Sequence, residues 1–219
     1  ICRSIMKPTW SFNCSIRMGE CFSQRKHRKN VEKFIANNVA AVIKGSEFPD
    51  EYIIITAHLD HEGIKDGIIY PGADDDGSGS VGMLEIAEAF AYAKKMGFGP
   101  KRSIIFLHVT AEERGLLGSK YYADYDRLVP LENTLANLNM DMIGRTESKR
   151  KETEPEDYIY IIGSEMLSDD LHNINKKAND EHVKINLDYR YNDPTSLVFE
   201  SGRYIENQYY YSCLLYTSD

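Results

Sequence analysis

The chain has 219 residues, of which 42% are hydrophobic, 27% charged and 11% aromatic, a composition typical of a globular protein. Its length can bury one sizeable core and leaves little room for two domains. The formal net charge of −8 disfavours a general nucleic-acid binder and is compatible with a bound cation. No apolar run approaches the roughly 18 residues of a transmembrane helix, so the sequence predicts no integral membrane segment.

The cysteines show neither the paired spacing of a zinc ribbon nor the density of a disulfide scaffold, so they leave the redox compartment open. They are Cys2, Cys14, Cys21 and Cys213. The first residue is isoleucine, so the lack of a signal peptide carries no information, and we interpret the sequence as a fragment. Residues 1–36 have no clear periodicity and are predicted to form an irregular lead-in.

From residue 37 onward, the sequence predicts alternating strands and helices. Short runs of apolar, β-branched residues indicate strands, and apolar residues spaced three and four apart indicate helices. In chain order, we predict strands over 39–43 and 52–56, a helix over 79–96, strands over 103–109, 134–140 and 158–162, and a helix over 165–180. The apolar stripe of the first helix is predicted to contain Val81, Leu84, Ala87, Phe90 and Ala91.

Several of these strands are apolar on both faces, which indicates that the sheet is covered on both sides. We therefore predict an α/β fold, with a mostly parallel (mixed) central sheet flanked by helices on both faces.

Residues of the types that commonly bind metals follow closely after three of the predicted strands. They are His58 and Asp60, then Glu112 and Glu113, and then Asp141. A further acidic group, residues 74–76, lies in a glycine-rich loop just before the first helix. Because the carboxyl ends of parallel strands meet at one edge of a sheet, these groups are expected to converge. Without a cation they would repel one another, and one imidazole among carboxylates suits zinc.

Four other histidines receive no role in this site. His108 lies inside a predicted strand, and His61 has no acidic partner at ligand spacing, so both are interpreted as bystanders. His172 and His182 belong to the second predicted helix and its end.

Two motifs that overlap the acidic loop suggest other ligands, but their context argues against both. Residues 77–82 match the G-x-G-x-x-G dinucleotide fingerprint, yet the three aspartates before them would repel a pyrophosphate. Residues 74–85 carry oxygen side chains at the spacing of a calcium loop, yet residues 68–72 cannot form the entering helix of an EF-hand.

Four blocks of the sequence resemble the signature blocks of the M28 family of co-catalytic zinc peptidases, which includes bacterial leucyl-type aminopeptidases. These are AHLDH at 57–61, PGADDDGSG at 71–79, AEERGLLGS at 111–119 and NMDM at 139–142. The resemblance implies a zinc-aminopeptidase-like fold and an enzyme that removes N-terminal residues from peptide substrates. Because relatives are mostly exported, it also implies a periplasmic or secreted location.

The resemblance implies a site for two zinc ions. His58 and Asp141 would bind one ion. Glu113 would bind the other, and Asp75 would bridge them. Asp60 would lie behind His58 and orient its ring.

Glu112 would be the general base that takes a proton from the attacking water, by analogy with the same family.

The end of the chain departs from the family pattern. Members supply a last histidine ligand after a tyrosine-rich segment, which residues 207–211 match, whereas residues 212–219 do not continue the pattern. We interpret residues 37–212 as a truncated M28-like domain and 213–219 as a non-native tail. The second zinc would then keep only Glu113 and Asp75, so we expect this chain to bind one zinc well and the other poorly, and its activity to be low.

Two alternatives keep the same fold. A glutaminyl cyclase-like enzyme would use a single zinc, but the complete set of acidic groups favours a peptidase. A non-catalytic interaction module would have lost its metals, and the retention of every acidic group as far as Asp141 argues against it.

Overall fold

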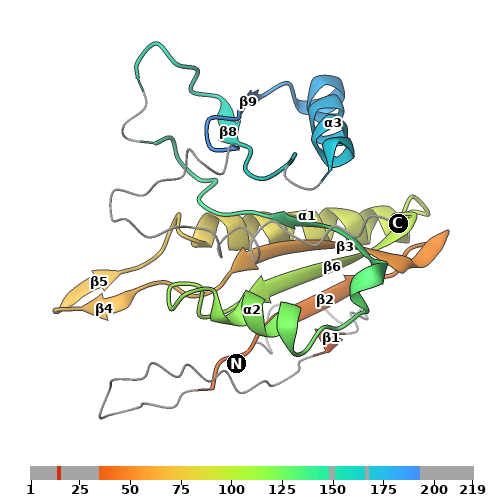
Figure 1. Ribbon diagram of the computed structural model, residues 1–219, viewed down its shortest axis with the longest axis horizontal. Helices are drawn as coiled ribbons and strands as arrows, with labels where there is room; N and C mark the ends of the chain where they lie inside the picture. The colour runs from red at the N-terminus through yellow and green to blue at the C-terminus, as the bar shows by residue number, and fades with distance from the viewer. Residues whose placement is uncertain (1–13, 16–34, 148–150, 166–167, 193–219) are drawn as a thin grey trace.

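The computed structural model describes residues 14–15, 35–147, 151–165 and 168–192 (Figure 1). The strands are β1 (Cys14–Ser15), β2 (Val39–Ile43), β3 (Phe48–His58), β4 (Gly63–Lys65), β5 (Ile68–Tyr70), β6 (Arg102–Val109), β7 (Thr134–Asn139), β8 (Tyr158–Tyr160) and β9 (Asn186–Asp188). The helices are α1 (Gly77–Lys95), α2 (Leu117–Asp124) and α3 (Asp169–Ala178), with a 3₁₀ helix η1 (Leu131–Asn133) and a π-helix η2 (Asn179–Val183). The predicted tail, nearly all of the predicted lead-in and the cysteine side chains lie outside the described residues.

A mixed five-stranded sheet with the order β1-β2-β6-β3-β7 forms the centre of the fold. Strands β6, β3 and β7 are parallel, whereas β2 is antiparallel to β6 and β1 is antiparallel to β2. The predicted α/β class and mixed sheet are therefore confirmed. The three parallel strands are also the ones whose ends carry the predicted site residues.

Two core clusters show that the sheet is covered on both faces. On one face, Met83 of α1 packs with Ile55 and Phe106 of the sheet. On the other face, Tyr122 of α2 packs with Ile54 and Ile105. Consecutive residues such as Ile54 and Ile55 serve opposite clusters because side chains alternate along a strand. Figure 1 shows α1 and α2 on opposite sides of the sheet.

Three of the five residues of the predicted stripe, Ala87, Phe90 and Ala91, pack against the sheet, whereas the two at the start of the helix do not. Val81 and Leu84 are 57% and 58% exposed, whereas Met83 is fully buried. Ile86 packs against the same cluster as Met83 and lies three residues further along the helix. The contacting face therefore follows the helical period and continues the later part of the predicted stripe, but it begins at Met83 instead of Val81 and Leu84.

Several elements differ from prediction in extent. Strand β3 begins at Phe48, four residues before the predicted strand, and its register with β6 shifts between Phe48 and Tyr52, which explains why the apolar pattern starts late. Helix α3 begins at Asp169, because the Ser168 hydroxyl accepts a hydrogen bond from the Asp170 N–H and caps the helix there.

The hairpin β4–β5 and helix α2 were not predicted. The hairpin turns at Asp66 and Gly67, which both have positive φ angles (52° and 79°). An Asp-Gly pair is a strong hairpin signal, so the sequence carried this information. Strands β8 and β9 form a separate parallel pair, and Figure 1 shows this pair with α3 on the α1 side of the central sheet. No helix among the described residues is long and apolar enough to cross a membrane.

Replacing Met83 with alanine should destabilise the fold by about 2–5 kcal/mol, because Met83 is fully buried between α1 and the sheet. Met96→Ala is the matched control: Met96 is 55% exposed at the end of the same helix, and its loss should cost no more than about 0.5 kcal/mol. Urea unfolding followed by circular dichroism measures both values. Equal losses in the two variants would contradict this packing.

Candidate metal centre

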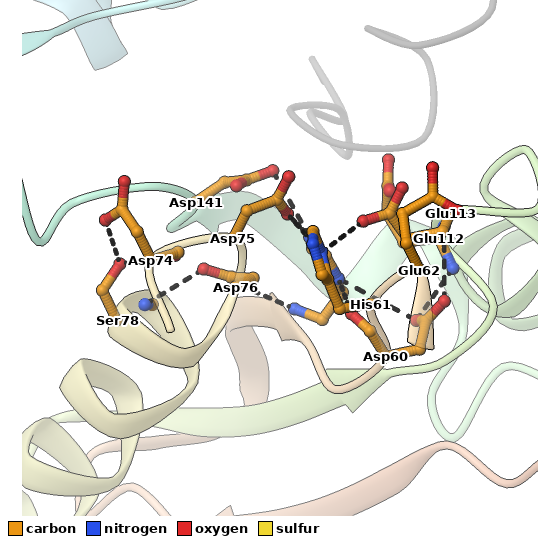
Figure 2. Close-up of polar contacts among 12 residues, drawn as sticks. Asp60, His61, Glu62, Asp74, Asp75, Asp76, Ser78, Glu112, Glu113 and Asp141 are labelled. Carbon is orange, nitrogen blue, oxygen red and sulfur yellow. Dashed lines mark hydrogen bonds and ion pairs between the residues drawn. The ribbon is translucent and has the colours of Figure 1, made fainter. Parts of the chain in front are cut away.

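The predicted site residues gather at the carboxyl edge of the three parallel strands. His58 is the last residue of β3, Glu112 and Glu113 follow β6, and Asp141 follows β7. Asp75 reaches the same place from the loop before α1. Figure 2 shows Asp75 and Asp141 on one side of His61, with Glu112 and Glu113 on the other. The convergence predicted from the strand ends is therefore present.

His58 has an unpartnered nitrogen aimed into this cluster. Its side chain is 3% exposed, and its Nδ1 donates a hydrogen bond to the Asp60 carbonyl oxygen at 2.8 Å. This bond fixes the ring so that the lone pair lies on Nε2. Nε2 is 3.0 Å from Asp75 Oδ1 and 3.8 Å from Asp141 Oδ2. It is buried and has no hydrogen-bond partner among the described residues.

A second group of ligand atoms contains His61. The Nδ1 atom of His61 is 2.6 Å from Glu113 Oε1 and 3.8 Å from Asp75 Oδ1. The expectation that His61 lacks an acidic partner is therefore wrong. The chain turns after β3 and returns His61 to the end of β6, a route that residue spacing alone does not reveal. One sequence signal points to His61 as a candidate ligand: it is a second histidine, three residues after His58.

The two groups fit a pair of metal ions. His58, Asp75 and Asp141 form one group, and His61, Asp75 and Glu113 form the other, with the ligand atoms of each group within 4.8 Å of one another. Asp75 belongs to both groups, as a bridging carboxylate does. Imidazole nitrogens and carboxylate oxygens are ordinary zinc ligands, and unpartnered buried lone pairs are what a cation would satisfy.

The pKa values of the clustered groups are shifted in the direction expected when carboxylates lie close together without a cation. Burial by itself would lower the pKa of His58, but the neighbouring carboxylates, Asp141 foremost, outweigh it and raise this pKa. Burial raises the pKa of Asp141 as well. Burial, together with nearby carboxylates, raises the pKa of Glu112 to about 7. Without a cation, the cluster therefore favours its protonated forms.

Asp60 contacts the His58 ring through its peptide oxygen. The peptide oxygen of Asp60 receives the His58 Nδ1 hydrogen bond, while its carboxylate oxygen lies 3.9 Å from that nitrogen. The carboxylate instead accepts hydrogen bonds from the backbone N–H groups of Glu112 (3.0 Å) and Glu113 (3.3 Å). One residue thus connects the end of β3 to the acidic pair that follows β6.

The three consecutive aspartates have three different roles. Asp76 is 2% exposed, and its carboxylate caps α1 by accepting from the Gly79 N–H at 3.0 Å and from the His58 N–H at 2.9 Å. Asp74 accepts from the Gly144 N–H at 2.8 Å. Only Asp75 reaches the candidate ligand groups.

These contacts also argue against the dinucleotide fingerprint at residues 77–82 and the calcium loop at residues 74–85. The Asp76 carboxylate already occupies the start of α1, where a pyrophosphate would need to bind. The Asp74 and Asp76 side chains bind separate backbone groups, and they do not converge as calcium ligands would.

Gly79 allows the loop and the end of β7 to approach each other. A Cβ atom at this position would lie 2.5 Å from the Met140 carbonyl oxygen and 2.3 Å from Asp76 Oδ1. Such contacts are shorter than a carbon atom tolerates, so only glycine fits. This close approach brings Asp75 beside Asp141.

His108 has a structural contact. It is buried in β6, and its Nε2 lies 3.2 Å from the Ser80 carbonyl oxygen at the start of α1. His172 lies 2.9 Å from the Ser164 hydroxyl, and His182 is exposed.

Residues 38–194 match Peptidase family M28, so the chain belongs to this family of zinc peptidases. The fold agrees with this assignment. The structure titled BSAP, a zinc aminopeptidase from Bacillus subtilis, is similar with a TM-score of 0.55 at 27% identity, covering 71% of this chain and 34% of that one. LapB from Legionella pneumophila gives a TM-score of 0.57 at 26% identity, covering 80% and 42%. The predicted family and zinc-aminopeptidase-like fold are confirmed.

Two curated relatives, both named as probable peptidases, match a smaller part of this chain than the solved structures do. A probable zinc metalloprotease of Pyrenophora teres f. teres (strain 0-1) is 37% identical over 121 residues, which are 53% of this chain and 24% of the relative. The probable glutamate carboxypeptidase LAMP1 of Arabidopsis thaliana is 36% identical over 104 residues, 48% of this chain and 14% of the relative. The matched part is thus a quarter or less of the length of these curated relatives.

Replacing Asp76 with alanine should lower the free energy of unfolding by about 2–4 kcal/mol, because two buried backbone N–H groups lose their acceptor. Asp76→Asn keeps one acceptor oxygen and should lose about half as much. Urea unfolding of the metal-free protein measures both. An alanine variant as stable as the asparagine variant would contradict this capping role.

Proposed function

We propose that this chain carries the site of a zinc metallopeptidase that cleaves single residues from the N-termini of peptides. The observation that carries the proposal is the pair of three-residue ligand groups sharing Asp75, with Glu112 beside them. When bound, zinc would supply Lewis-acid chemistry, which makes a water molecule a nucleophile near neutral pH and polarises the scissile carbonyl.

Glu112 is suited to move the proton in this reaction. Its carboxylate takes a proton from the attacking water as the water oxygen bonds to the carbonyl carbon. It then gives the proton to the amine nitrogen as the C–N bond breaks. In the metal-free protein, burial raises the pKa of Glu112 to about 7, and its side chain stands beside both candidate ligand groups. Asp60 assists by holding the backbone of Glu112 and Glu113 in place.

The names of the similar proteins support two kinds of exopeptidase. The bacterial structural neighbour is called a zinc aminopeptidase, and the plant relatives are called probable glutamate carboxypeptidases. We favour the aminopeptidase because the similarity to the bacterial structure extends over more of this chain, 71% against 48%. A periplasmic or secreted location remains a proposal that rests on the family alone.

One set of peptides separates these activities. The zinc-loaded chain is incubated with a peptide that has a free N-terminus, with its N-acetylated form, and with a peptide that begins with glutamine. Mass spectrometry then identifies the products. Release of residues from the free N-terminus only supports the aminopeptidase. Equal cleavage of the acetylated peptide at its C-terminus indicates a carboxypeptidase, pyroglutamate indicates a cyclase, and no product indicates a binding module.

Glu112→Gln should reduce kcat by about 10²–10⁴-fold and leave the zinc content unchanged, because the amide cannot take the proton. Glu113→Gln is the matched comparison. It alters a candidate ligand, so its zinc content should fall along with its activity. Zinc analysis and steady-state kinetics on both variants provide the measurement. A Glu112→Gln variant with normal kcat would overturn the role of this carboxylate.

Chelation of zinc should abolish hydrolysis and lower the unfolding temperature, since the clustered carboxylates then face one another without a cation. Adding zinc back should restore both properties. Differential scanning calorimetry and the peptide assay, before and after a chelator, test this expectation. An unchanged unfolding temperature would show that the cluster does not hold a metal.

A further inference from the structure

We infer that His61 is a ligand of the second zinc ion, bound through its Nδ1 atom together with Asp75 and Glu113. The inference rests on the zinc site proposed above and changes its composition. The second ion would then have three protein ligands within the described residues, which replaces the expectation that only Asp75 and Glu113 would hold it.

The distances fit a shared metal. Ligand atoms about 2.1 Å from a tetrahedral zinc lie about 3.4 Å from one another. The separations of His61 Nδ1 from Glu113 Oε1 (2.6 Å) and from Asp75 Oδ1 (3.8 Å) lie on either side of that value. All three ligand atoms lie within 4.8 Å of one another.

The two closest atoms are not hydrogen-bonded to each other. His61 Nδ1 and Glu113 Oε1 are both buried, and neither has a hydrogen-bond partner among the described residues, although they are 2.6 Å apart. A simple His–Glu ion pair would place an N–H on the line between the two atoms. A buried nitrogen and a buried carboxylate oxygen that lie this close without a hydrogen bond are ligand atoms that one cation can satisfy.

The backbone makes room for the His61 ring in this position. Gly72 has a φ of +66°, and a Cβ atom there would lie 2.6 Å from His61 Cβ and 2.8 Å from its Cγ. The imidazole therefore packs directly on the loop that carries Asp75, and a larger residue at position 72 would displace it. The ring is held beside the bridging carboxylate by packing that does not depend on the metal.

The first experiment counts metals. Zinc per chain is measured by elemental analysis after dialysis for the wild type, His61→Ala, His61→Gln and the control His182→Ala, whose side chain is 74% exposed. We expect two zinc ions in the wild type and the control, and one in both His61 variants. Affinity at the second site should fall more than about 100-fold, beyond the 10–100-fold typical of residues that only support a ligand.

The second experiment detects the bond itself, so it does not depend on a variant that folds. The chain is labelled with isotopic nitrogen in its histidines and loaded with an NMR-active cadmium isotope in place of zinc. Scalar coupling between cadmium and His61 Nδ1 is expected. Absence of this coupling in a protein that binds two cadmium ions overturns the inference.

The outcomes separate this inference from the proposed function. Two zinc ions retained in both His61 variants, or only one in the wild type, overturn the role of His61 while the peptidase proposal stands. No tight zinc in the wild type overturns both. Circular dichroism of the metal-free variants confirms that any loss of zinc reflects a lost ligand and not a lost fold.

Discussion

The clustering of histidine nitrogens and carboxylate oxygens around Asp75, at one edge of the sheet, is the feature on which this site depends. Buried nitrogens of His58 and His61 face carboxylate oxygens of Asp75 and Glu113 at 2.6–3.8 Å, and no hydrogen bond joins them. Such an arrangement is unfavourable unless protons or cations lie between the groups. Burial first, and then the neighbouring carboxylates, raise the pKa of Glu112 to about 7 in the same cluster. A divalent ion relieves the repulsion at both groups because Asp75 belongs to each. Metal binding and the local structure of this edge are therefore coupled.

The surrounding scaffold keeps these groups close together by satisfying the backbone around them. Asp76 joins the start of α1 to the end of β3, and Asp60 joins the end of β3 to the acidic pair after β6. Glycines 72 and 79 remove side-chain volume where loops approach most closely. Fixed ligands of this kind do not have to be ordered when the ion binds, which lowers the entropic cost of binding.

Membership of Peptidase family M28 and the similarity to a bacterial zinc aminopeptidase agree with this chemistry. The topology of the sheet explains how this fold can gather a set of metal-binding side chains. Three parallel strands end at the same edge, so each loop after a strand can add one or two candidate ligands without changing the core. The matched relatives are much longer than this chain, and most of their length lies outside the stretch that they share with it.

The sequence by itself determined the α/β class, the order of the main elements and the strand ends where acidic residues and His58 would meet. These features follow from local apolar periodicity and from the rule that parallel strands share a carboxyl edge. Family resemblance, rather than periodicity, selected Asp75 among three consecutive aspartates. Only the tertiary structure decided that His61 reaches Glu113, that the Asp60 peptide oxygen holds the His58 ring, and that Met83 rather than Leu84 faces the sheet. Each of these depends on the path of a loop or the rotation of a helix against its neighbour, and contacts between residues distant in sequence set that geometry.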